Sequence, residues 1–134
     1  MGKRIVSLKI NNCRAYCSNY DALTLPKGEN VLIYGENGSG KSSLYKAMNN
    51  YFTKSNSPSL AFVKNRYLEH LEGEISITFS EFTNPLLQII SGTNEEYVFG
   101  STGHDNNIEF IKTASLVNGF LDYTDLLKVY LHKE

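Results

Sequence analysis

A glycine-rich segment that runs into a lysine and two serines is the part of this sequence with the clearest chemistry. Residues 35–43 read Gly-Glu-Asn-Gly-Ser-Gly-Lys-Ser-Ser, so Gly35 to Ser42 match the spacing G-x4-G-K-S/T. Glycine has no Cβ atom, and the backbone at Gly35, Gly38 and Gly40 can therefore wrap closely around an anion and point successive N–H groups at it. This spacing is typical of a phosphate-binding loop.

The side chains after the loop would complete such a site. A helix that begins at Lys41 would direct its unsatisfied N–H groups and the positive end of its dipole toward the same anion. The ammonium group of Lys41 would act as the catalytic cation on the β- and γ-phosphates, Ser42 would be a ligand of Mg2+, and Ser43 would donate to the α-phosphate. We therefore expect ATP and Mg2+ as cofactors. The alternative is a glycine-rich strand-to-helix turn with a lysine there by chance, and the position of the match argues against it.

Hydropathy patterns place the loop between a strand and a helix. Residues 5–10 alternate between apolar and polar side chains, which predicts a half-buried strand, and residues 22–25 fit a second, shorter strand. Residues 30–34 form an apolar run that is typical of a strand covered on both faces, and this run leads directly into the loop. After the loop, Leu44, Ala47, Met48 and Tyr51 recur at helical spacing, which predicts a helix from 41 to about 53.

The rest of the chain shows shorter signals. Alternation over residues 74–80 predicts an edge strand. Further elements are expected as strands over residues 86–90 and 97–99, polar loops over residues 54–59 and 100–107, and an amphipathic helix over residues 123–131. We expect one domain over residues 1–134.

Composition excludes several classes of protein. Of the 134 residues, 41% are hydrophobic and 20% are charged, which is too apolar for a disordered chain. The 13 basic and 14 acidic side chains give a net charge of -1, so the whole surface is not basic as in a protein that binds nucleic acid by charge alone. No apolar run is long enough to span a bilayer and the N-terminus has no secretory pattern, so we expect no membrane partner and a cytoplasmic location. Cys13 and Cys17 are expected to be reduced thiols.

Residues 8–48 resemble the opening of the ABC-type ATPase heads of the SMC, RecF and RecN class. Residues 12–16, Asn-Cys-Arg-Ala-Tyr, fit the family's N-F/C-R-x-F/Y turn, and residues 36–43 fit its phosphate loop. The resemblance implies an α/β P-loop NTPase fold, namely lobe I of the head, with a mixed sheet packed around the P-loop helix. It also implies that Arg14 lies near the nucleotide; the alternative is a solvated arginine at a strand end. The expected nucleotide-binding residues are Arg14, Gly35, Glu36, Asn37, Gly38, Ser39, Gly40, Lys41, Ser42 and Ser43.

Several parts of a complete head are missing from the sequence. Hydrolysis in this class needs an acidic Walker B strand and a signature motif, and neither occurs in these residues. We therefore expect an N-terminal lobe of a longer ATPase, incomplete without its C-terminal lobe. The resemblance implies a homodimer of heads joined by ATP and action on DNA in repair, chromosome maintenance or anti-phage defence, in the last case beside a nuclease. Lys64 and Arg66 would form a DNA-facing loop, or simply belong to the surface.

Two other functions fit a phosphate loop. A self-contained small kinase or nucleotidase would need a pair of lid arginines, and the chain has only three arginines, Arg4, Arg14 and Arg66. A scaffold domain could also hold a nucleotide without turning it over. Phosphoryl-transfer assays and nucleotide-dependent stability separate these two alternatives from the ATPase lobe.

Overall fold

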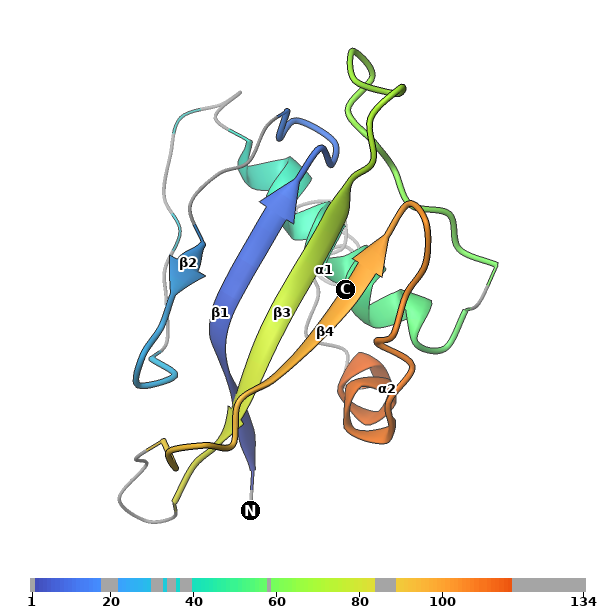
Figure 1. The fold of residues 1–134 in the computed structure, drawn as a ribbon. Helices are drawn as coiled ribbons and strands as arrows, with labels where there is room; N and C mark the ends of the chain where they lie inside the picture. The colour runs from blue at the N-terminus through green and yellow to red at the C-terminus, as the bar shows by residue number, and fades with distance from the viewer. Residues whose placement is uncertain are drawn as a thin grey trace, which may run out of the picture.

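A computed structural model describes residues 2–17, 22–29, 33, 36, 40–57, 59–83 and 89–116 of the chain. Four strands and two helices are present in these residues (Figure 1). In chain order they are β1 (Lys3–Asn11), β2 (Leu23–Thr24), α1 (Lys41–Lys54), β3 (Glu74–Glu81), β4 (Glu95–Gly100) and α2 (Glu109–Leu116).

The strands form one sheet in the order β2-β1-β3-β4, and each of these pairings is antiparallel. The prediction of an edge strand over residues 74–80 was therefore wrong, because β3 lies between β1 and β4. Alternating hydropathy indicates that one face of a strand is less buried than the other. It does not indicate whether another strand pairs on each side. The predicted mixed sheet is not seen among the described strands. The strand predicted over residues 30–34 lies largely outside the described residues, so the mixed character stays a prediction.

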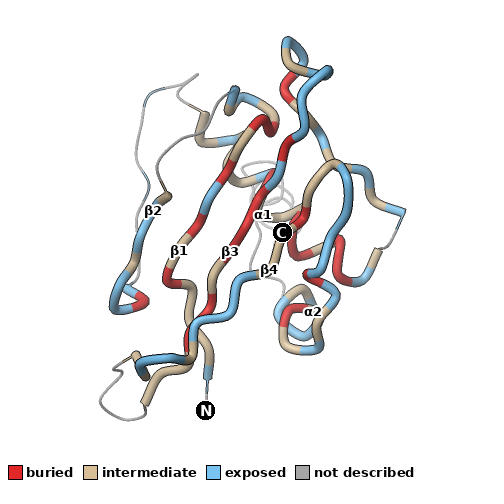
Figure 2. The backbone as a smooth tube through the Cα atoms, in the orientation of Figure 1, coloured by how far each residue is buried: buried red, intermediate tan, exposed pale blue. Residues whose placement is uncertain are grey.

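One face of the sheet carries the apolar core. In the register, Ile10 of β1 faces Ile75 of β3, and Leu8 faces Ile77. Figure 2 shows buried residues alternating along β1 and running almost continuously along β3. The buried core consists of Leu8, Ile10, Cys13, Ala47, Tyr51, Phe52, Ile75, Ile77, Phe79, Phe99 and Ile111.

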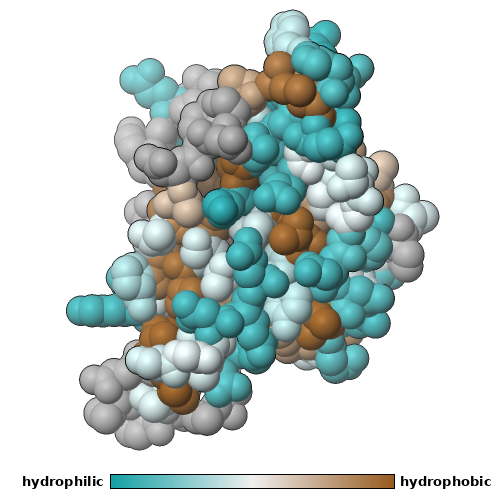
Figure 3. Space-filling model, viewed as in Figure 1, coloured by the Kyte–Doolittle hydropathy of each residue, from teal (hydrophilic) through white to brown (hydrophobic). Residues whose placement is uncertain are grey.

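Both helices pack on this apolar face. Phe79 of β3 makes edge-to-face contacts with Phe52 of α1 at 6.5 Å and with Phe110 of α2 at 5.0 Å between ring centroids. Figure 3 faces the sheet from the side away from α1 and shows mostly hydrophilic and neutral colours over it. On that side Ser76 of β3 bonds to the Glu96 carboxylate of β4. The sheet is thus covered by helices on one face only within the described part of the chain.

Helix α1 confirms the predicted helix and its buried face. Ala47 and Tyr51 are buried, and Leu44 and Met48 pack against the core. The helix includes Lys54, so the predicted polar loop begins later than residue 54. The ammonium group of Lys54 donates to the Leu60 carbonyl at 2.8 Å and lies 5.5 Å from the Phe99 ring, which satisfies this buried cation.

Helix α2 was not predicted from the sequence, and hydrogen bonds join it and the residues before it to α1. The amide of Asn106 donates to the Tyr51 carbonyl, and Asn56, just after α1, donates to the Lys112 carbonyl at 3.2 Å. Strand β4 confirms the prediction over residues 97–99. The helix predicted over residues 123–131 and most of the strand predicted over 86–90 lie outside the described residues. Neither α1 nor α2 has the length and hydrophobicity that crossing a membrane would require.

The buried hydroxyl of Tyr51 gives a first test of the packing. It donates to the Tyr97 carbonyl at 2.9 Å, and burial raises the pKa of Tyr51 well above its ordinary value. Tyr51→Phe keeps the ring but removes this bond, so the free energy of unfolding should fall by about 1 kcal/mol in urea titrations. Tyr67→Phe is the matched control, because Tyr67 is 79% exposed, and it should leave stability unchanged. Equal effects of the two changes would contradict the assigned bond.

The two cysteines should differ in reactivity. Cys13 is buried and Cys17 is exposed. Burial, only partly opposed by the charge of Arg14, raises the pKa of the Cys13 thiol from 9.0 to about 11. Iodoacetamide at pH 8, followed by mass spectrometry, should label Cys17 first, and labelling of Cys13 should accelerate as the pH rises toward 11. Because the folded protein favours the neutral thiol, the stability that Cys13 contributes is fully present below about pH 9. This contribution is lost as the pH rises through 11 and the buried thiol must ionise. Rapid labelling of Cys13 at pH 8 would contradict its burial.

Candidate phosphate-binding site

The backbone at the start of α1 is shaped for an anion. Gly40 is the N-cap residue with φ 96° and ψ 3°, a left-handed conformation that residues with a Cβ atom rarely adopt. Among the described residues no side chain caps the helix, and no acidic residue lies in its first turn. The first N–H groups of a helix have no acceptor within the helix, and its dipole is positive at this end. The start of α1 therefore fits an anion better than a cation.

The structure describes about half of the predicted site residues. Gly40, Lys41 and Ser43 are half-buried around the start of α1, while Ser42 and Glu36 are exposed. That the hydroxyl of Ser42, one residue into the helix, holds a phosphate-bound Mg2+ stays a prediction. Gly35, Asn37, Gly38 and Ser39 lie outside the described residues, so their role in the loop stays a prediction.

A tight turn at the end of β1 reaches the same place. The main chains of Cys13 and Tyr16 exchange two hydrogen bonds of 2.9 Å, which closes the turn over Arg14 and Ala15. The Tyr16 hydroxyl then donates to the Gly40 carbonyl at 3.3 Å. That carbonyl also accepts the main-chain N–H of Leu44 at 3.0 Å. The turn predicted to lie near the nucleotide is thus anchored at the last glycine of the loop.

Arg14 occupies the tip of this turn with two unusual features. Its φ is 52°, in the left-handed region. Its Nε is buried and has no hydrogen-bond acceptor within the described part of the chain. A buried donor without an acceptor costs free energy, and an arginine donor fits a phosphate oxygen. That Arg14 serves the nucleotide stays a prediction, with an arginine solvated at a strand end as the alternative.

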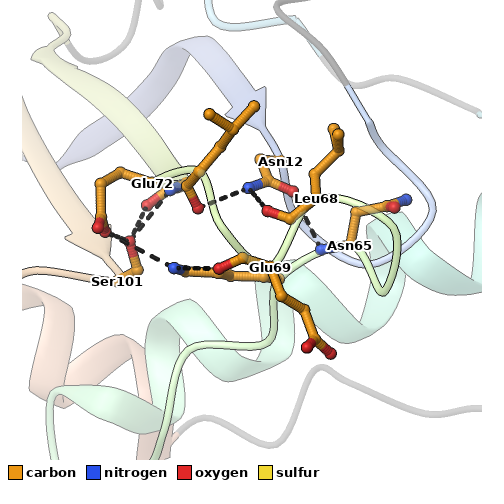
Figure 4. Close-up of polar contacts among 9 residues, drawn as sticks. Asn12, Asn65, Leu68, Glu69, Glu72 and Ser101 are labelled. Atoms are coloured by element: carbon orange, nitrogen blue, oxygen red, sulfur yellow. Dashed lines mark hydrogen bonds and ion pairs between the residues drawn. The ribbon is translucent and has the colours of Figure 1, made fainter.

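Two asparagines hold this turn: Asn12, the first residue of the predicted family turn, and Asn65, which the sequence did not single out. Figure 4 shows the contacts of Asn12 with Asn65 and Leu68. Asn12 is buried with φ 44°, and its Oδ1 accepts the main-chain N–H of Asn65 at 3.2 Å. The Nδ2 of Asn12 donates to the carbonyls of Leu68 and Leu71. Asn65 is also buried, and its Nδ2 donates to the Arg14 carbonyl at 2.8 Å. Asn65 has no local signal in the sequence, whereas Asn12 begins the predicted turn and asparagine tolerates left-handed backbone.

The residues predicted to form a DNA-facing loop lie on either side of Asn65. Lys64 donates to the Glu69 carbonyl at 3.1 Å and lies 3.9 Å from the Glu72 carboxylate, so it already has local partners. Arg66 is exposed, and its guanidinium lies 5.6 Å from the ring of Tyr67. Contact of either side chain with DNA stays a prediction.

Comparison with known proteins identifies a family for this chain. A search of curated proteins found no match. Residues 7–113 match a family model described as an AAA domain. The match covers most of the chain and includes the turn at the end of β1, the phosphate loop and α1. The chain therefore belongs to the AAA domain family and carries an ATPase-like domain.

Proposed function

We propose that this chain is the ATP-binding lobe of an SMC- or RecF-like ATPase that acts on DNA. One observation carries the proposal: the motif Gly35 to Ser42 contains Gly40, whose left-handed backbone opens a helix of 14 residues that no side chain among the described residues caps. The family match supports an ATPase-like domain, and the N-C-R-A-Y turn beside Gly40 supports the narrower class.

Different residues of this chain would bind different parts of the nucleotide. The N–H groups of the loop and of the first turn of α1 hold the phosphates, and Lys41 neutralises charge on the β- and γ-phosphates. Bound Mg2+ supplies charge neutralisation across the phosphate oxygens, and Ser42 is the hydroxyl of this chain that would hold it. Ser43 donates to the α-phosphate, and Arg14 offers its buried Nε–H to a phosphate oxygen.

Hydrolysis would need groups from outside these residues. An attacking water must be oriented by an acidic group, and charge on the opposite side of the phosphates must be stabilised. We propose that a C-terminal lobe of the same ATPase supplies the acidic strand and that a second head, in a homodimer joined by ATP, supplies the signature motif. DNA repair, chromosome maintenance and anti-phage defence beside a nuclease, all in the cytoplasm, are the settings in which this class would act.

Replacing the loop lysine tests the proposal. Lys41→Ala should lower the affinity for Mg2+-ATP by at least about tenfold, because an ammonium group that pairs with phosphate oxygens is lost. A fluorescent ATP analogue titrated into the purified chain measures this. Lys46→Ala, a change of an exposed lysine on the same helix, is the control and should bind normally. Unchanged affinity in Lys41→Ala would refute the phosphate site, and transfer of phosphate to small acceptors would favour a kinase.

Replacing Gly40 tests the backbone rather than a charge. An added Cβ would meet only ordinary contacts, the nearest 3.5 Å away at the Tyr16 hydroxyl, so the effect of Gly40→Ala comes from φ 96°. Left-handed backbone costs a non-glycine residue about 1–2 kcal/mol. Gly92→Ala is the matched control, with φ 79° and no atom within 4 Å of its added Cβ. Both changes should lower the melting temperature similarly, and only Gly40→Ala should also weaken ATP binding. Normal ATP affinity in Gly40→Ala would contradict the role of this glycine.

A further inference from the structure

The turn that carries Arg14 is held by a segment about fifty residues further along the chain. We call residues 63–71 the bracing segment. The N–H of Arg14 donates to the Val63 carbonyl at 3.1 Å, and its carbonyl accepts Nδ2 of Asn65 at 2.8 Å. Both main-chain polar groups of Arg14 are therefore fixed by the bracing segment, while β1 and Tyr16 hold the two ends of the turn.

Asn12 joins the bracing segment to the end of β1 with every polar group of its side chain. The amide offers one acceptor oxygen and two donor hydrogens. The oxygen accepts from the N–H of Asn65, and the nitrogen donates to the carbonyls of Leu68 at 2.9 Å and Leu71 at 3.0 Å. An added Cβ on Gly73 would lie 2.3 Å from the carbonyl oxygen of Asn12, so the chain after the bracing segment packs directly on the same backbone.

This arrangement holds the turn in a conformation that costs free energy. Asn12 and Arg14 both have left-handed backbone, at φ 44° and 52°. Such a conformation persists only when the surroundings impose it, and it is often found at functional sites. Asparagine tolerates left-handed backbone better than arginine does, so the conformation of Arg14 depends most on its bonds to Val63 and Asn65. The fold also leaves Arg14 Nε buried without an acceptor in the described residues.

We infer that Asn12 and Asn65 are positioning residues of the phosphate site, which set its affinity by holding Arg14 and Tyr16 beside Gly40. This inference rests on the proposed function, because it takes Arg14 to be a phosphate ligand. Asn65 acts through the Arg14 carbonyl, and Asn12 acts through the main chain of Asn65. The bracing segment thereby controls nucleotide affinity through the backbone of the turn rather than through its own charges.

An isosteric substitution separates positioning from packing. Asn65→Asp keeps the size of the side chain and an oxygen that can accept from the N–H of Tyr67, but it removes the donor to Arg14. The full chain should bind Mg2+-ATP at least about tenfold more weakly, the effect of losing one well-formed polar contact. Cys13, buried in the same turn, should be alkylated faster at pH 8 because the turn opens more often.

Asn106→Asp is the matched control. Asn106 is a fully buried asparagine whose Nδ2 donates to the carbonyl of Tyr51, ten residues along α1 from Lys41. The change removes one donor from a backbone carbonyl, as Asn65→Asp does, so both variants should lose stability. ATP affinity of Asn106→Asp should stay within about twofold of the original chain, because its lost bond lies about 15 Å along α1 from Lys41.

Tyr16→Phe provides a second variant that does not depend on the folding of Asn65→Asp. It removes only the hydroxyl that contacts the Gly40 carbonyl, and it should also weaken ATP binding. If Asn65→Asp fails to fold, unchanged affinity in Tyr16→Phe overturns the inference by itself.

The outcomes separate the inference from the function on which it rests. If the original chain does not bind ATP, the proposed function fails and the inference falls with it. If the original chain binds ATP and Lys41→Ala does not, while Asn65→Asp binds normally, the phosphate site stands and the positioning role is overturned. If Asn106→Asp loses as much affinity as Asn65→Asp, the loss reflects general stability, and the positioning role is again overturned.

Discussion

The carbonyl oxygen of Gly40 is the point where the two parts of the candidate site meet. It accepts the first main-chain bond of α1 from Leu44 and the hydroxyl of Tyr16 from the turn after β1. Its position follows from the left-handed backbone at Gly40, which only glycine adopts without strain. The direction of the helix N-terminus and the place of the turn are therefore set by one peptide group. A change there would move both sources of positive charge, the helix end and Arg14.

The sheet supplies the rigidity that this contact needs. Strand β1 lies between β2 and β3, and its pairing with β3 runs from Lys3 to Asn11, directly up to the turn. Helix α1 packs against the same strands through Ala47 and Tyr51. Because the strand end and the helix start share one core, the distance between them cannot change without disturbing packed side chains.

The buried polar groups around the turn are satisfied unequally. The oxygen and the nitrogen of each side-chain amide, in Asn12 and in Asn65, form hydrogen bonds. The buried Nε of Arg14 has no acceptor within the described ranges. Buried networks that are fully bonded specify one geometry, because each lost bond is costly in a medium of low dielectric constant. A donor left over inside such a network is therefore well suited to a ligand that arrives later.

The sequence by itself determined most of the local elements and predicted the phosphate loop. Periodicity predicted β1, β3, β4 and α1, since the spacing of apolar residues reports which side of an element faces away from water. The helix was predicted to begin at Lys41, directly after Gly40, because the motif places the loop before a helix. Helix α2 has only eight residues, too few for stability alone, and it depends on Ile111 and Phe110 finding the core. Only the tertiary structure decided that β3 is an inner strand and that Asn12 and Asn65, 53 residues apart, brace Arg14. Such contacts leave no periodic signal, because they form only when the core brings distant parts of the chain together.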